Sequence, residues 1–158
     1  MYSNDLIIKI LDYIDKNIDR QISIDELSKR FFYNRYYIMK LFKKELNITI
    51  FDYINKIKIY NCLYDIKYKN DFFTKISLNH GFISLDYFSR LFKKVMKVSP
   101  LQYKKYIKKE SNKYEHDIIL TQLIELNTLI NRIKKYRENI KPQELKVKTL
   151  FTFKNNTQ

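Results

Sequence analysis

Apolar side chains recur every three or four positions along most of the chain, which is the spacing of amphipathic α-helices. Ile7, Leu11 and Ile14 form one such stripe and predict a helix over residues 4–18. The sequence Ser-Ile-Asp-Glu at residues 23–26 is typical of a helix N-terminus, where the Ser hydroxyl and Glu carboxylate accept hydrogen bonds from free backbone N–H groups. A short second helix should therefore follow it.

Capping residues predict five further helices before residue 110. Asn34, Thr49, Ser84 and Ser99 each precede an apolar stripe, as N-cap residues do, and Pro at the first helical position after Ser99 is tolerated. Gly81 is the only glycine and follows a helical stripe, where a left-handed residue is favoured. The expected helices span residues 35–46, 51–64, 73–80, 85–96 and 100–109.

The apolar pattern also contains an internal repeat. Lys-Leu-Phe-Lys-Lys at residues 40–44 returns fifty positions later as Arg-Leu-Phe-Lys-Lys at residues 90–94. A repeat of this length indicates one supersecondary unit used twice. Each copy is a pair of helices joined by a turn of three or four residues, as in helix-turn-helix units. The other matching pairs are Tyr37 with Tyr87, Ile48 with Val98, Thr49 with Ser99, and Tyr53 with Tyr103.

The charge of the chain indicates an anionic partner. Lys and Arg number 31 against 17 Asp and Glu, which gives a formal net charge of +14. Such an excess favours nucleic acid, or less often an anionic membrane. The chain is also rich in Asn, Ile and Tyr and has a single Gly, a bias typical of AT-rich coding sequences that inflates Lys without a functional reason. The repeat is therefore the stronger argument.

Other features exclude several classes of protein. Cys62 is the single cysteine, so we expect a core residue in a reducing compartment and no disulfide framework. The N-terminus lacks the pattern of a signal peptide, and no apolar run approaches the roughly 20 residues that cross a bilayer, so a cytoplasmic protein without membrane contact is expected. One glycine excludes a P-loop, and His80 and His116 lie far apart, so we expect no enzyme, cofactor or metal site.

The second repeat carries many residues at fixed spacings. They are Ile76, Ser77, Gly81, Phe82, Ser84, Tyr87, Phe88, Ser89, Arg90, Phe92, Lys93, Lys94, Val98, Ser99, Pro100 and Tyr103. With looser matches at residues 23–27 and 36–44, residues 5–107 resemble the DNA-binding domain of AraC/XylS-type transcriptional regulators. The resemblance implies an all-α, seven-helix domain at residues 1–110, in which a connecting helix joins two helix-turn-helix subdomains. It also implies a regulator of transcription, chiefly an activator, with double-stranded DNA and RNA polymerase as partners.

The chain departs from the family pattern in places. Phe31 and Phe32 stand in the first turn, where the family usually has Gly, and Lys104 replaces an Arg after the Tyr. The spacing of the two units nevertheless suits DNA. A connecting helix over residues 51–64 spans about 21 Å, which with its flanking units brings the two recognition helices toward the ~34 Å of one DNA turn.

The apolar stripe of each recognition helix, residues 35–46 and 85–96, determines which residues face outward. Lys40 and Arg90 suit O6 and N7 of guanine, and Asp86 suits a cytosine amino group or orients Arg90 from one turn away. Apolar contact with thymine methyl groups suits Tyr36, Met39 and Leu85. From the family's base-reading positions and the outward face, the expected base-reading residues are Arg35, Tyr36, Met39, Lys40, Leu85, Asp86, Ser89 and Arg90. The expected phosphate contacts are Asn34, Lys43, Lys44, Ser84, Lys93 and Lys94.

Residues 111–158 form a C-terminal extension that the resemblance does not explain. Heptad-like spacing over residues 112–140 predicts an amphipathic helix, which either docks on its own domain or forms a homodimer or binds a protein partner. Pro142 is expected to end this helix, and alternation over residues 145–153 predicts a short strand. The residues expected at a dimer or partner contact are Ile119, Leu123, Leu126, Ile130 and Ile133.

Two other functions stay open. A helical interaction protein would use residues 112–140 to bind or inhibit another regulator, with weak DNA contact. A basic module would bind RNA or an anionic membrane, and either basic helix taken singly is also explained as a solvated face. Because the extension is short, we expect regulation by abundance or by a partner bound to it rather than by a small effector.

Overall fold

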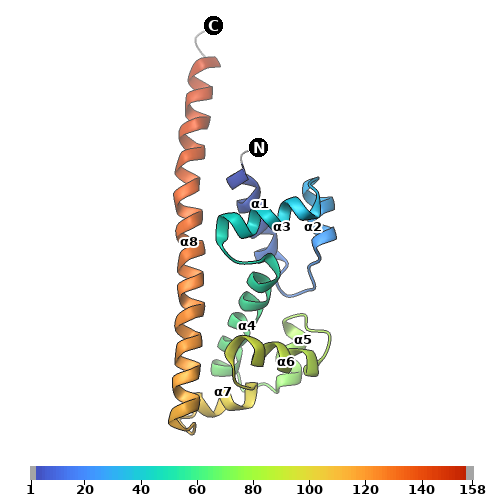
Figure 1. Ribbon diagram of the computed structural model, residues 1–158, viewed down its shortest axis with the longest axis vertical. Helices are drawn as coiled ribbons and strands as arrows, with labels where there is room; N and C mark the ends of the chain where they lie inside the picture. Colours follow the sequence, from blue (N-terminus) through green and yellow to red (C-terminus); the bar gives the residue numbers. More distant parts are fainter. Residues whose placement is uncertain (1–2, 156–158) are drawn as a thin grey trace.

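The computed structural model describes residues 3–155, with side chains for residues 3–140, and this part of the chain is helical without strands. The all-α prediction is confirmed. Figure 1 shows seven shorter helices on one side of a long C-terminal helix, which runs along the whole molecule. The helices are α1 (Ser3–Lys16), α2 (Ile24–Phe31), α3 (Arg35–Leu46), α4 (Ile50–Tyr68), α5 (Phe73–Asn79), α6 (Leu85–Met96), α7 (Pro100–Ile107) and α8 (Lys113–Asn155).

The N-caps expected from the sequence are formed. The side-chain oxygen of Asn34 accepts a hydrogen bond from the backbone N–H two residues on, and Ser23, Thr49 and Ser84 accept one from three residues on. Ser99 takes part in a reciprocal capping box with its third helical residue at the start of α7. Each such cap stabilises its helix by about 0.5–2 kcal/mol, so these residues determine where five helices begin.

The two helix-turn-helix turns use different residues in a left-handed conformation. Phe32 ends α2 with φ 59°, and its side chain is 94% exposed. Gly81 has φ 73° in the turn between α5 and α6. A left-handed conformation costs a residue with a Cβ about 1–2 kcal/mol, so the first turn carries backbone strain at Phe32.

Two hydrophobic cores form, one in each half of the domain. The first lies among α1, α2, α3 and the start of α4, and the second lies among the rest of α4, α5, α6 and α7. Ile54 of α4 belongs to the first core and Ile59 to the second. Helix α4 is thus the shared support of both units, and α8 contributes side chains to each core.

Burial repeats with the sequence. Ile38 and Phe88 are fully buried, as are Phe42 and Phe92, and Leu41 and Leu91 are each 7% exposed. These equivalent positions therefore face the core in both α3 and α6, and most of the remaining positions of the two helices face outward.

Three expectations about the secondary structure are wrong: the end of the connecting helix, the end of the C-terminal helix and the strand after it. The connecting helix α4 continues to Tyr68 instead of ending near residue 64, which makes it 19 residues long. Helix α8 passes through Pro142, and residues 145–153 are helical instead of forming a strand. Apolar residues that alternate along residues 145–153 also include pairs four residues apart, so the same pattern fits a helix. Among residues 3–155 there is no second strand for them to pair with.

Candidate nucleic-acid interface

The two recognition helices are presented in the same manner. Figure 1 shows α3 and α6 one above the other, with α4 running between the two units. Each begins at a capping side chain, Asn34 or Ser84, directly after the turn of its unit. Because the buried faces of both helices pack on their own cores, the first turn of each helix projects away from the protein.

The outward positions divide into two groups. Six of the eight residues expected to read bases are exposed: Arg35, Tyr36, Lys40, Leu85, Asp86 and Arg90. Met39 and Ser89 are half-buried instead of fully outward, and Met39 packs against the first core. These two positions are equivalent in the repeat and lie at the border of the apolar stripe, so a long side chain there folds onto the core.

Charged contacts distinguish the two helices. In α6, Asp86 and Arg90 form an ion pair of 3.2 Å one turn apart, with their side chains 79% and 72% exposed. In α3, the Arg35 guanidinium lies 5.2 Å from the ring centre of Tyr36 and 3.6 Å from a carboxylate oxygen of Asp25 in α2. Exposed ion pairs are worth little, so both arginines can exchange these partners for others.

The residues expected at phosphates are also exposed. They are Asn34, Lys43, Lys44, Ser84, Lys93 and Lys94. The oxygens of Asn34 and Ser84 already accept the capping hydrogen bonds, of 2.8 and 3.1 Å, so what these residues can offer an anion is the Asn34 amide NH₂ and the Ser84 hydroxyl hydrogen.

A buried polar cluster, made of Lys58, Asp65 and His80, holds the two units together. Lys58 is 4% exposed. Its ammonium group donates hydrogen bonds to the carbonyl of Arg20 at 2.9 Å and to the carbonyl of His80 at 3.3 Å. The His80 ring lies 2.8 Å from a carboxylate oxygen of Asp65. From the first unit, the Gln21 side-chain amide donates to the Gly81 carbonyl at 3.0 Å. Polar groups from both units and from α4 are therefore joined in one cluster, in which Nδ1 of His80 lies 3.3 Å from a carboxylate oxygen of Asp19 but forms no hydrogen bond with the described residues.

Burial and hydrogen bonds shift the ionisation of this cluster. Burial lowers the pKa of Lys58, although the nearby Asp19 opposes the shift. Burial alone would raise the pKa of Asp65, but hydrogen bonds from Lys69 and His80 outweigh it and lower that pKa below its ordinary value. The charged form is therefore disfavoured at Lys58 and favoured at Asp65.

The sequence analysis did not identify this cluster, although one signal was present. Lys58 stands four residues from Ile54 and from Cys62, within the buried stripe of α4. A lysine in an otherwise apolar stripe needs buried acceptors, which here are carbonyls of two loops.

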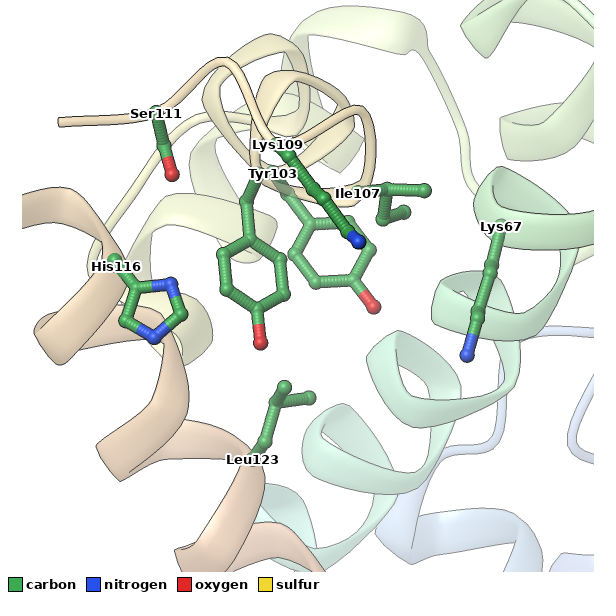
Figure 2. A pocket seen from close by; sticks show the side chains of 8 residues that line it. Lys67, Tyr103, Ile107, Lys109, Ser111, His116 and Leu123 are labelled. Carbon is green, nitrogen blue, oxygen red and sulfur yellow. The ribbon is translucent and has the colours of Figure 1, made fainter.

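A large hollow lies apart from the recognition helices. It has a volume of about 580 Å³ and lies where α4, α7 and α8 meet, and no residue of α3 or α6 lines it. Figure 2 shows Lys67 and Lys109 on its rim and Leu123 and His116 of α8 on the side opposite Lys67. The remaining lining residues are Tyr103, Tyr106, Ile107 and Ser111.

Within the described residues, no cluster of His, Cys, Asp and Glu is arranged to hold a metal ion. No helix in this part of the chain is long and apolar enough to cross a membrane.

The residues expected at a dimer or partner contact lie on the chain itself. Ile119 and Leu126 are buried in the second core and Ile133 in the first, while Leu123 and Ile130 are half-buried. Helix α8 is thus docked on its own domain in this structure, and association with another chain through it stays a prediction.

Comparison with known proteins identifies the two-unit arrangement. The model of the helix-turn-helix domain family matches residues 27–106, which include both turns and both recognition helices. The chain belongs to the AraC/XylS-type family of helix-turn-helix DNA-binding domains. The family and fold are those of DNA-binding transcription regulators and not of enzymes.

Two relatives of the chain match different shares of it. The chain is 26% identical over 148 residues to an uncharacterized HTH-type transcriptional regulator of Staphylococcus aureus. This match covers 91% of the chain but only 20% of the relative, so the chain spans about a fifth of that protein. It is 29% identical over 95 residues to the multiple antibiotic resistance protein MarA of Salmonella typhimurium, with coverage of 60% of the chain and 75% of the relative.

Solved structures of AraC-type domains share the fold. The C-terminal domain of AraT, a response regulator from Geobacillus stearothermophilus, has a TM-score of 0.62 at 24% identity and matches 64% of the chain and 84% of its own length. The DNA-binding domain of the global transcriptional factor AdpA, solved with a target DNA, has a TM-score of 0.59 at 12% identity. The match covers 63% of the chain and 90% of the AdpA domain.

Proposed function

We propose that the protein reads a specific site on double-stranded DNA by inserting α3 and α6 into successive major grooves, and thereby regulates transcription. The observation that carries this is the repeated burial of α3 and α6, which leaves equivalent faces of two helices free on one domain. Helix α4, 19 residues long, spans about 28 Å, close to the ~34 Å between grooves one DNA turn apart. A major groove admits one helix, so each unit can occupy one.

The exposed faces carry chemistry that suits base edges. Lys40 and Arg90 are equivalent positions, and both suit O6 and N7 of guanine. Tyr36 and Leu85 offer apolar surface to thymine methyl groups. Asp86 either accepts from a cytosine amino group or orients Arg90 through the 3.2 Å ion pair. We include Arg35, Met39 and Ser89 in the base-reading set, the last two as residues that touch the groove from its edge.

Phosphate contacts would come from the ends and flanks of the same helices. Lys43, Lys44, Lys93 and Lys94 are exposed, and Asn34 and Ser84 lie at helix N-termini, which attract anions. These contacts fix register without reading sequence, and they make affinity fall as salt rises.

We further propose that the bound protein activates transcription by contacting RNA polymerase. Membership of the AraC/XylS-type family, to which the resemblance assigns chiefly activators, favours this direction of regulation. A reporter gene behind a selected site tests it: expression should rise with the amount of protein. A fall in expression would mean repression.

The test of DNA reading is selection of bound duplexes from a randomised pool near physiological salt. Because α3 and α6 carry different residues at all four pairs of proposed base-reading positions, we expect an asymmetric site of two short elements about one helical turn apart. A palindromic repeat of such sites would indicate association of two chains. Binding without enrichment of any sequence would contradict base reading and favour a helical interaction protein with weak DNA contact.

Two substitutions in α6 separate base reading from phosphate contact. Arg90→Ala should weaken binding to the selected site by about 1–3 kcal/mol and relax preference at one base pair. Lys94→Ala, which removes one charge four residues away, should weaken all sequences alike and reduce the salt slope by about one. Equal losses on specific and random DNA for both variants would show that Arg90 does not read a base.

A further inference from the structure

Helix α8 is anchored to both helix-turn-helix units, outside the residues 27–106 that match the family. Its Ile119 and Leu126 are buried in the second core, and its Leu129 and Ile133 in the first. Helix α8 therefore passes from one unit to the other just after Leu126, and Figure 1 shows it running the length of both.

Polar contacts fix α8 to the first unit. The Arg137 guanidinium pairs with Asp12 and, at 2.6 Å, with Asp15 of α1. The Arg132 guanidinium donates to the carbonyl of Leu46, at the C-terminal end of α3, where a cation is favoured by the helix dipole. This contact joins α8 directly to a recognition helix.

Polar contacts also fix the beginning of α8 to the second unit. Asn112 caps the helix by accepting from the N–H of Glu115 at 2.8 Å, and the Gln102 amide of α7 donates to the Glu115 carboxylate at 3.1 Å. The apolar anchors Ile119 and Ile133 are fourteen residues apart, so they lie about 21 Å apart along one helix.

Two connecting helices, α4 and α8, restrain the relative motion of the two units more than α4 alone would. If α4 were the only connection, bending or twisting of that helix would change the distance between α3 and α6. A second helix that is attached to both units must be stretched, bent or detached for the same change to occur, and its buried side chains oppose this. The polar cluster around Lys58 adds a third contact between the units.

We propose that α8 is a splint that fixes the spacing and relative orientation of α3 and α6, with Leu129 and Ile133 as its positioning residues on the first unit. The inference rests on the proposed DNA reading for its purpose, because two helices held at a fixed separation bind two elements as one ligand. The Staphylococcus aureus relative matches 91% of the chain, which must include the greater part of α8.

The test compares two matched double variants of the full chain. Leu129→Ala with Ile133→Ala removes buried anchors that are 6% and 4% exposed. The control, Leu120→Ala with Ile124→Ala, changes the same residue types at the same spacing on the same helix, where the side chains are 42% and 58% exposed. Circular dichroism should show the same helix content for both.

The first readout needs no DNA. Spin labels on cysteines introduced at the exposed, equivalent positions Lys43 and Lys93 report the distance between the two recognition helices, and native Cys62 is fully buried and so is not labelled. The variant of Leu129 and Ile133 should show a broader distribution of distances than the parent, and the control should match the parent. Equal widths in all three proteins would overturn the splint. So would equal broadening in variant and control.

The second readout uses the selected DNA site. The parent should lose affinity when about 5 bp, half a helical turn, separate the two elements further, whereas the undocked variant should tolerate the insertion and bind the original pair roughly tenfold more weakly. Unchanged discrimination between spacings in that variant would also count against the splint. If the parent shows no preference for paired elements, the proposed function fails, and the width of the distance distribution still decides the role of α8.

An independent pair of variants distinguishes the loss of the α8 contact from a general defect in core packing. Arg137→Ala breaks two ion pairs and leaves the apolar anchors of α8 in place, and Lys135→Ala removes the same charge from an exposed position two residues away. The first should broaden the distances in the same direction, although less, and the second should not. No difference between them, together with parental widths in the Leu129 and Ile133 variant, would overturn the proposal.

Discussion

Replacing Gly81 with alanine would test how closely the two helix-turn-helix units approach each other. A Cβ at this position would lie 2.0 Å from the carbonyl oxygen of Asp19, 2.5 Å from its carbonyl carbon and 2.8 Å from the Cα of Arg20. All three are backbone atoms of the loop between α1 and α2, so no side-chain rotation relieves the overlap. The loop of the first unit must move away from the second.

The expected loss of stability follows from two contributions. The φ of 73° at Gly81 costs an L residue about 1–2 kcal/mol by itself. Displacing the loop also lengthens the 2.9 Å hydrogen bond from the Lys58 ammonium to the Arg20 carbonyl, and a bond of this kind is worth about 1.5–3 kcal/mol. Gly81→Ala should therefore lower the free energy of unfolding by about 2.5–5 kcal/mol, and Tm by roughly 10 °C.

Calorimetry of Gly81→Ala beside Asn47→Ala separates the two contributions. Asn47 also has a left-handed φ, of 52°, but it is an exposed residue, so its replacement adds strain without a collision and should cost about 1 kcal/mol. If the two variants lose equal stability, the contact between the units is not rigid and the reasoning fails.

Three further changes test local features. Hydrogen bonding from Arg20, opposed by burial and aided by Tyr13, lowers the pKa of Glu26 to about 2, so its contribution to stability is complete above about pH 4.5 and is lost as pH falls toward 2. Glu26→Gln should thus reduce the loss of stability over that range in urea unfolding followed against pH, and an unchanged pH profile would contradict this. Phe32→Gly should raise the free energy of unfolding by up to about 1 kcal/mol by relieving left-handed strain, and a lower value measured in urea would refute it. Lys58→Met should lower stability by about 1–3 kcal/mol because the carbonyls of Arg20 and His80 lose their donor, and a stability at or above the parent's would show that they are satisfied otherwise.

Local signals predicted most of the fold. Capping residues such as Ser84 and Thr49 act within one turn of the chain, so the sequence showed where helices begin. The apolar stripe of α3 and α6 likewise showed which face is buried, because helical periodicity does not depend on distant residues. Met39 and Ser89 were the exceptions, since their position borders the stripe and the packing of the cores decides its burial.

Long-range contacts were not predictable in the same way. The cluster of Lys58, Asp65 and His80 depends on two loops, one from each unit, that the fold brings together. The prediction for the C-terminal part of α8 was wrong for a similar reason. Alternation after Pro142 fits both strand and helix, and the sequence does not show whether a neighbouring strand exists.

The difference between the exposed faces of α3 and α6 gives the bound protein a direction. If each helix reads its own element, the chain sits on the duplex in one orientation, and reversing the site turns the whole molecule around. Helix α8 extends past α1 at the end of the molecule that holds the first unit (Figure 1). The orientation of the site would then decide whether that end of α8 faces the transcription start or points away from it.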